Sequence, residues 1–126
     1  MPKFIGIEIA FAIHHDQVNT FGGLDGVRDQ GLLESALGQA QQTHTYTEDI
    51  YEAAAQYGVS LAKNHPFLDG NKRTAADCLL TFLVLNGIEP TLTPEQLFEW
   101  ILQVAVSELE RAGLAKLLRT HSHRRR

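Results

Sequence analysis

The amino-acid sequence predicts an all-α fold, a compact bundle of about six helices around one central buried helix. Apolar residues recur at steps of three and four along most of the chain, which is the spacing of one helix face. The alternation of apolar and polar residues that marks a half-buried strand is nearly absent. With 126 residues, of which 44% are hydrophobic, the chain is long enough to bury a core and fits one domain.

The first third of the chain is predicted to hold two helices joined by a loop. Four apolar residues at helical spacing indicate the first helix: Ile5, Ile9, Ala12 and Ile13. This helix ends near Phe21, and the glycine-rich segment 22–26 forms a turn or an exposed loop. Asp29 is a suitable N-cap for a short helix that ends at Gly38. The polar stretch 39–49 is interpreted as a connection.

Two longer helices follow. Thr47 or Asp49 begins the first of them, which runs to about Lys63 before Asn64, His65 and Pro66 interrupt it. Its buried face is predicted to contain Ile50, Ala54, Tyr57 and Leu61. A buried helix then runs from about Asn71 to the stop signal Asn86-Gly87. Its predicted inward residues are Ala75, Leu79, Phe82 and Leu83.

The C-terminal third begins with a strong helix start, in which Thr93 is the cap, Pro94 occupies the first turn and Gln96 reaches back. A further helix is predicted over about 107–119. Residues 120–126 end in HSHRRR and are predicted to form a basic, disordered tail. Residues 1–119 therefore form the single predicted domain.

Charge and hydropathy exclude several classes of function. The formal net charge is −4, and it falls to −7 without the three C-terminal arginines. A body this acidic argues against direct nucleic-acid binding. No apolar stretch reaches transmembrane length, and Glu8 interrupts the apolar N-terminus, which makes that segment a poor signal peptide. We therefore expect a cytoplasmic protein that does not bind a membrane.

Cysteine and histidine usage predicts no structural metal site. Cys78 is the only cysteine, so an internal disulfide is excluded, and its apolar surroundings predict a core residue. Two histidine pairs could suggest a metal, but neither has further ligands at a suitable spacing. We expect these histidines at the surface: His14, His15, His121 and His123.

The most informative segment is HPFLDGNKRTA, residues 65–75. A helix begins at or beside Asn71, so Lys72 and Arg73 place two cations at the positive end of its dipole. This arrangement costs stability unless an anion neutralises both, and free N–H groups at a helix start also favour anions. Gly70 lets the backbone approach a ligand closely. The natural ligand is phosphate and, with two cations, a polyphosphate.

Three other residues complete a possible reaction site. Asp69 lies inside the cationic loop, and a carboxylate next to phosphates is favourable when Mg²⁺ lies between them. His65 can accept a proton from an incoming hydroxyl. Phe67 and Pro66 anchor and stiffen the loop. Each residue alone has an ordinary structural explanation, but together they predict phosphoryl or nucleotidyl transfer.

The segment resembles the signature loop of the Fic/Doc superfamily, whose Fic branch has the pattern HPFx(D/E)GNGRxxR. Lysine after GN, followed by Arg-Thr-Ala, is similar to the Doc (death-on-curing) toxin branch. The resemblance extends to FGGLDGVRDQGLLESAL at 21–37, and covers about residues 4–119. It implies a Fic-like helical bundle with the active loop at the N-terminus of the central helix.

The resemblance also implies a role for each residue. His65 would activate the hydroxyl of a target protein, and Asp69 would bind Mg²⁺. Gly70, Asn71, Lys72 and Arg73 would hold the phosphates of ATP. Phe67 would be a structural anchor. The loop at 22–26 would help to receive the target.

Two departures from the Fic pattern bear on the reaction. Adenylyltransferases of the Fic branch have glycine where this chain has Lys72, and a second arginine where it has Ala76. Doc proteins share both departures, and the resemblance implies a kinase that transfers the γ-phosphate of ATP to a threonine of elongation factor Tu and blocks translation. The alternatives are AMP transfer to a hydroxyl and a non-catalytic module that retains the phosphate loop.

The resemblance also implies how the protein is restrained. The internal inhibitory pattern of the family, (S/T)xxxE(G/N), is absent, because Gln96 follows Thr91 and Glu95. A separate antitoxin would then bind the protein through a flexible segment that folds into a groove. Trp100, with Phe98 and Ile101, is expected either in the core or in this groove.

Overall fold

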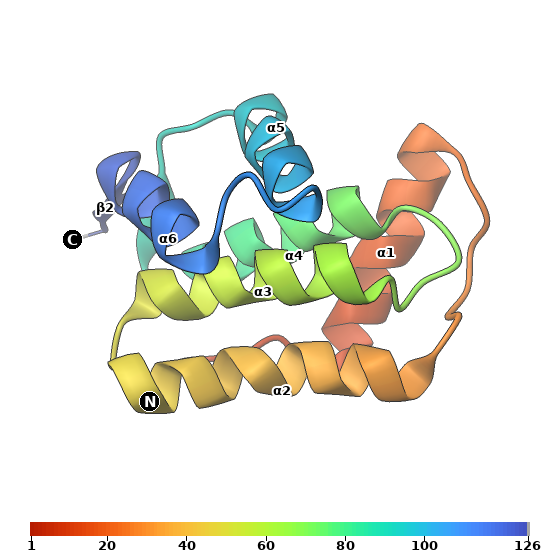
Figure 1. Ribbon diagram of the computed structural model, residues 1–126, viewed down its shortest axis with the longest axis horizontal. Helices are drawn as coiled ribbons and strands as arrows, with labels where there is room; N and C mark the ends of the chain where they lie inside the picture. The colour runs from red at the N-terminus through yellow and green to blue at the C-terminus, as the bar shows by residue number, and fades with distance from the viewer. Residues whose placement is uncertain (126) are drawn as a thin grey trace.

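The computed structural model describes residues 1–125, which form six helices and two three-residue strands (Figure 1). The elements are α1 (Ile7–Phe21), α2 (Gln30–Thr47), α3 (Ile50–Asn64), α4 (Asn71–Leu85), β1 (Ile88–Pro90), α5 (Pro94–Ala105), α6 (Arg111–Thr120) and β2 (Ser122–Arg124). This architecture confirms the predicted all-α class with about six helices. Over these residues, no helix combines the length and the apolar character needed to cross a membrane.

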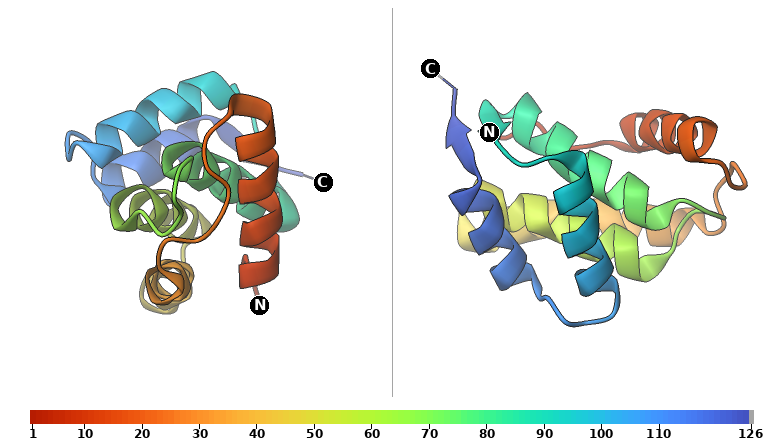
Figure 2. Two further views of the ribbon diagram at one scale, coloured as in Figure 1. Left: turned by 90° about the vertical axis from the view of Figure 1, so that its right-hand side faces the viewer. Right: turned by 90° about the horizontal axis from the view of Figure 1, so that it is seen from above.

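Helices α3 and α4 form the centre of the bundle and pack against each other. Helices α2 and α6 cover α3, helix α1 covers α4, and α5 contacts both central helices, as Figures 1 and 2 show. Gly58 lies where α3 crosses α5, because a Cβ atom there would come within 2.9 Å of Ile101 Cδ1. Helix α4, which begins within the HPFLDGNKRTA segment, is thus contacted by α1, α3 and α5.

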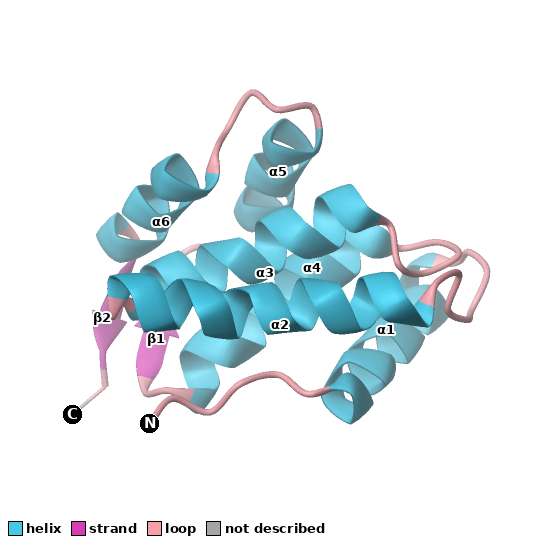
Figure 3. Ribbon diagram, turned by 60° about the horizontal axis from the view of Figure 1, so that its bottom comes forward, coloured by secondary structure: helices cyan, strands magenta, loops and turns pink. Residues whose placement is uncertain are grey.

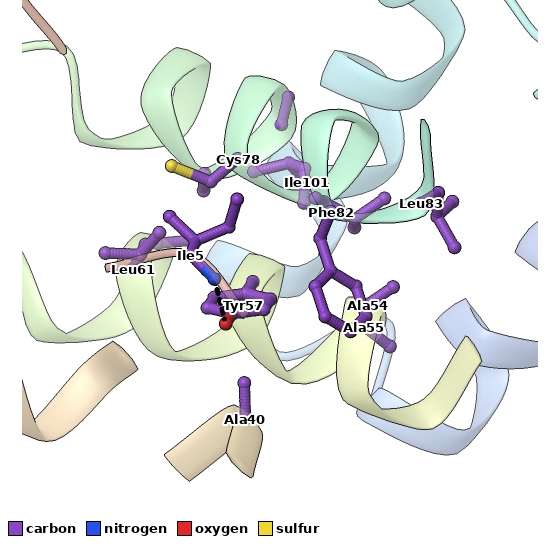
Figure 4. Close-up of a cluster of buried hydrophobic side chains, with 14 of the residues drawn as sticks. Ile5, Ala40, Ala54, Ala55, Tyr57, Leu61, Cys78, Phe82, Leu83 and Ile101 are labelled. Atoms are coloured by element: carbon purple, nitrogen blue, oxygen red, sulfur yellow. Dashed lines mark hydrogen bonds between the residues drawn. The ribbon is translucent and has the colours of Figure 1, made fainter. Parts of the chain in front are cut away.

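The core between these helices contains the residues predicted for the inward faces of α3 and α4, except Ile50, which is partly buried against it (Figure 4). Tyr57 is fully buried, and its hydroxyl oxygen accepts a 2.8 Å hydrogen bond from the Ile5 N–H, which fastens the N-terminal segment to α3. Burial raises the pKa of this phenol and of the Cys78 thiol. Cys78 is thus the protonated core residue that its apolar surroundings predict.

Three predicted helix starts are confirmed by hydrogen bonds. The Asp29 carboxylate accepts from the Leu32 N–H, and the Asp49 carboxylate accepts from the first N–H groups of α3. Thr93 and Gln96 form a reciprocal capping box at the start of α5. These caps explain why local sequence alone places the starts of α2, α3 and α5.

Helix α2 is longer than predicted, since the polar stretch 39–47 continues it instead of forming a connection. Ala40 and Thr43 remain buried at the helical spacing set by earlier residues of α2. Gln39 also bonds with Gln56 and with Ser60 on α3. Small and amide side chains thus continue the α2–α3 contact where no large apolar residue marks it.

The buried face of α1 differs from the predicted one. Ile9 is 40% exposed and Ala12 is also exposed, whereas Ile13 is buried as expected. The inward residues of α1 are Ala10, Ile13, His14 and Val18. The prediction used Ile5 to set the phase, but Ile5 precedes the helix and is buried independently of it.

The C-terminal region is ordered up to residue 125, contrary to the predicted disordered tail. Strand β2 pairs antiparallel with β1 (Figure 3), and Ile88 lies opposite Arg124. The Arg125 N–H adds a 2.8 Å bond to the Gly87 carbonyl oxygen. Backbone pairing of this kind does not require apolar side chains, so the basic composition of this segment did not indicate a strand. Arg126 lies outside the described residues.

The last helix starts later than the predicted residue 107. Ser107 has a φ of 62°, a left-handed conformation that a helix does not continue through. Helix α6 begins at Arg111, with Glu110 as its N-cap. Residues 107–109 therefore form a turn between α5 and α6.

Candidate active site

The loop that joins α3 to α4 carries most of the predicted site residues. His65 ends α3 with a φ of 50°, and Gly70 precedes α4 with a φ of 73°. These two left-handed residues reverse the chain at both ends of the loop. His65 and Asp69 are exposed, so the histidine and the carboxylate predicted to do chemistry are both accessible.

Asn71 closes the loop on itself. Its Oδ1 accepts a 2.9 Å hydrogen bond from the Phe67 N–H, and its Nδ2 donates a 3.0 Å bond to the Phe67 carbonyl oxygen. Phe67 is 1% exposed, which fits its predicted role as an anchor. The Asn71 side chain was predicted to hold phosphate, but its amide group instead bonds to the loop backbone and fixes the conformation of the loop. Its backbone N–H, at the start of α4, is the group directed toward an anion.

His14 supports the loop from α1 and was wrongly expected at the surface. It is 2% exposed, and its ring stacks on Phe67 with centroids 3.9 Å apart. Its Nε2 lies 2.7 Å from the Asp69 carbonyl oxygen, and because a carbonyl only accepts, Nε2 carries the proton. The spacing of His14 from Ala10 and Val18, four residues on either side, was the signal that could have found it.

The segment between α1 and α2 runs along the active loop, and Figure 1 shows both connections at the same end of the molecule. Val27 and Phe67 form an antiparallel bridge. The Leu68 N–H donates to the Gly26 carbonyl oxygen at 3.0 Å, and the Leu24 N–H donates to Asp69 Oδ2 at 2.9 Å. The glycine-rich segment is thus part of the site, and it orients the Asp69 carboxylate.

Arg28 from the same segment fixes the end of α3. Its Nε donates to the His65 carbonyl oxygen at 2.7 Å, and its Nη2 donates to the Asn64 carbonyl oxygen at 3.0 Å. These carbonyl groups at a helix C-terminus lack partners within the helix and carry the negative end of the dipole. Arg28 therefore stabilises the turn that positions His65. Sequence reasoning missed this residue because the two segments are far apart in the chain.

The two predicted cations lie in the first turn of α4, which contains no acidic residue. Gly70 accepts a bond from the Thr74 N–H, so the N–H groups of residues 71–73 form the open helix start. Lys72 and Arg73 line a hollow of about 240 Å³ together with Gly70 and Asn71. Helix dipole, N–H groups and two cations converge there, as an anion site requires.

A second hollow, of about 290 Å³, lies between α1, α4 and α5. Its residues are Gln17, Phe21, Arg73, Ala76, Asp77, Leu80, Pro94, Glu95 and Phe98. We call this hollow the α1–α4–α5 groove. Phe98 lines it, whereas Ile101 lies in the core and Trp100 contacts the ring of His121 edge-on. Trp100 is partly buried against the core, so these three residues of α5 are divided between the groove and the core, as expected.

The side chains at the loop suit a cation that is also held by phosphate. Asp69 offers one carboxylate, and over residues 1–125 no three His, Cys, Asp or Glu side chains are grouped to hold a metal by themselves. Mg²⁺ is commonly bound by one or two carboxylates plus phosphate oxygens and water. Asp69 fits a Mg²⁺ ion that arrives with a nucleotide.

Comparison with known proteins finds one family profile and two relatives. The profile described as the Fic/DOC family matches residues 4–83. Protein kinase doc of Escherichia phage P1 is 35% identical over 119 residues, which cover 93% of this chain and 94% of that protein. Toxin Doc of Mycolicibacterium smegmatis is 47% identical over 73 residues, which cover 55% of each chain. The chain described here belongs to the Fic/DOC family.

Proposed function

We propose that this protein is the toxin of a toxin–antitoxin module and a protein kinase. It transfers the γ-phosphate of ATP to a threonine of a translation factor, elongation factor Tu, and thereby blocks translation. The observation that carries the proposal is the open start of α4, which has Lys72 and Arg73 in its first turn and follows the loop with the exposed His65 and Asp69. The names of the two relatives, a protein kinase and a toxin, support it.

The loop divides the reaction among its residues. The polyphosphate of ATP binds at the N-terminus of α4, where Lys72, Arg73 and the backbone N–H groups neutralise its charge. Asp69 would hold Mg²⁺, which supplies further neutralisation of the phosphate oxygens. His65 takes the proton of the threonine hydroxyl. The hydroxyl oxygen then bonds to the γ-phosphorus, the bond from that phosphorus to the β–γ bridging oxygen breaks, and ADP leaves.

Lys72 and Ala76 favour phosphoryl transfer over AMP transfer. Lys72 replaces the glycine, and Ala76 the second arginine, of the Fic adenylyltransferase pattern that this loop resembles. Ala76 is buried, one turn beyond Lys72 and Arg73, and it lines the α1–α4–α5 groove. A cation is thus present at position 72 and missing at position 76, which supports transfer of the γ-phosphate rather than of AMP.

The antitoxin is proposed to bind in the α1–α4–α5 groove. Phe21, Leu80, Pro94 and Phe98 give the groove apolar walls, while Arg73 and Asp77 offer polar contacts. A flexible segment that folds on binding would bury these rings and satisfy the charges. The absence of an internal inhibitory pattern is consistent with restraint by a separate chain.

Two parallel incubations test the proposal. The protein, Mg²⁺ and elongation factor Tu are combined with ATP labelled at either the γ- or the α-phosphate. The proposal expects label on the target protein from the γ position alone. Label from the α position alone would establish AMP transfer instead.

A second experiment tests the alternative of a non-catalytic module. Growth of cells expressing the wild-type protein is compared with growth of cells expressing His65→Ala at the same level. The proposal expects growth inhibition by the wild-type protein only. Equal inhibition by both proteins would favour a binding module.

A further inference from the structure

The guanidinium group of Arg73 lies between two phenylalanine rings. Its Cζ is 3.8 Å from the ring centroid of Phe21 and 4.2 Å from that of Phe98. Phe21 is the last residue of α1, and Phe98 lies in the first half of α5. The left view of Figure 2 shows the end of α1 beside α5. We call these three residues the arginine clamp.

The clamp compensates for an unfavourable position. Arg73 lies in the first turn of α4, where the helix dipole repels a cation. The negative faces of two aromatic rings attract a guanidinium group and offset part of this repulsion. Among the described residues, the ion pairs found do not include Arg73. The rings hold the cation in place while its charge remains available to an anion.

The geometry also restricts how Arg73 can donate hydrogen bonds. A guanidinium group is planar, and its five N–H bonds lie in that plane. Because a phenylalanine ring lies close to the guanidinium group on two sides, a ligand approaches the edge of that group, where the N–H bonds point. Bidentate contacts to phosphate use this edge. A freely rotating arginine would lose more side-chain entropy when it bound the same ligand.

The exposure of Phe21 fits this role. Its side chain is 56% exposed, so core packing does not account for a large apolar residue at this site. All three clamp residues line both the hollow at the start of α4 and the α1–α4–α5 groove. The clamp therefore forms part of the wall shared by the two hollows.

We propose that Phe21 and Phe98 are positioning residues that orient Arg73 for edge-on binding of the nucleotide polyphosphate. Neither residue belongs to the loop 65–75. The inference rests on the proposed function, in which Arg73 is a phosphate ligand. It assigns part of that site to α1 and α5, and makes phosphate affinity depend on two aromatic rings.

The test is the dissociation constant for Mg·ATP and for inorganic triphosphate, measured by calorimetry. Phe21→Leu and Phe98→Leu keep apolar bulk but remove the ring. Each is expected to weaken binding by about 2- to 30-fold, the range of a cation–π contact. Phe21→Tyr retains the ring and, at this exposed site, is expected to restore affinity to within about twofold of wild type. Phe11→Leu is the matched control, because Phe11 is also on α1 and 38% exposed but lies outside the clamp.

The outcomes separate this inference from the proposed function. Arg73→Gln provides the reference, and circular dichroism confirms that each variant is folded. If Arg73→Gln weakens binding but both Phe→Leu variants bind like wild type, the clamp is refuted while the phosphate site stands. A Phe21→Tyr variant as weak as Phe21→Leu also refutes the clamp, because the ring is then not the required feature. If Arg73→Gln itself binds normally, the phosphate role of Arg73 in the proposed function is wrong.

Discussion

The imidazole of His14 lies flat against the ring of Phe67, with centroids 3.9 Å apart and planes 7° from parallel. His14 also donates a hydrogen bond from Nε2 to the Asp69 carbonyl oxygen. One side chain on α1 thus contacts both the buried anchor of the active loop and the backbone of its proposed metal ligand. This contact couples the position of the loop to the position of α1.

Replacing His14 tests this coupling. His14→Ala removes the stack and the hydrogen bond, and we expect it to lower the free energy of unfolding by about 2–4 kcal/mol. His14→Phe preserves a ring beside Phe67 but leaves the Asp69 carbonyl without its donor, and a loss of about 1–3 kcal/mol is expected. Urea unfolding followed by circular dichroism measures both. Equal stability of His14→Ala and the wild type would show that the contact does not support the fold.

Asn71 is predicted to act through loop shape. Asn71→Ala removes both hydrogen bonds to the Phe67 backbone, in a buried position, and should cost about 2–4 kcal/mol of stability. Asn71→Asp keeps an acceptor for the Phe67 N–H but places a carboxylate oxygen against the Phe67 carbonyl oxygen, so it should not restore stability. Thermal unfolding of the wild type, Asn71→Ala and Asn71→Asp measures these differences in stability. A stable Asn71→Ala protein with weak ATP binding would instead support a direct phosphate role for the amide.

Lys72 should reduce stability while it supports binding. Lys72→Ala removes a cation from the positive end of the α4 dipole, and an increase of about 0.3–1 kcal/mol in unfolding free energy is expected at low salt. The same change should weaken Mg·ATP binding. Lys116→Ala, in the middle of α6, is a control that lacks the dipole effect. A Lys72→Ala variant that is less stable than the wild type and binds ATP normally would contradict both proposed effects of Lys72.

Asp69 is predicted to be needed for chemistry and dispensable for folding. Asp69→Asn retains an oxygen that can accept from the Leu24 N–H, so the unfolding free energy should change by less than about 1 kcal/mol. Its negative charge is lost, and Mg²⁺-dependent phosphate transfer should fall steeply. Transfer is measured with γ-labelled ATP over a range of Mg²⁺ concentrations. An unchanged Mg²⁺ dependence would rule out Asp69 as the ligand.

The sequence predicted those parts of the fold that depend on local signals. Asp29, Asp49 and Thr93 cap their helices because the cap and its N–H partners are neighbours in the chain. The apolar faces of α3 and α4 were also predictable, because these central helices bury large side chains. The cationic start of α4 followed from the same local reasoning.

The remaining features arise from contacts between distant segments. His14 is buried because the face of α1 that carries it is turned toward the active loop. The prediction assigned another face because it counted Ile5, which precedes the helix, as part of it. Strand β2 exists because its backbone meets β1, which side-chain composition does not reveal. Phe98 was expected in the core or the groove, and its contact with Arg73 requires α5 to lie beside the start of α4.

His65 provides the most direct test of phosphoryl transfer at this loop. The rate of γ-phosphate transfer to elongation factor Tu is measured for wild type and for His65→Ala under saturating Mg·ATP. We predict measurable transfer by the wild type and a decrease of about 10²- to 10⁴-fold in the variant, the usual contribution of a general base. Equal transfer by the two proteins would contradict the proposed role of this site.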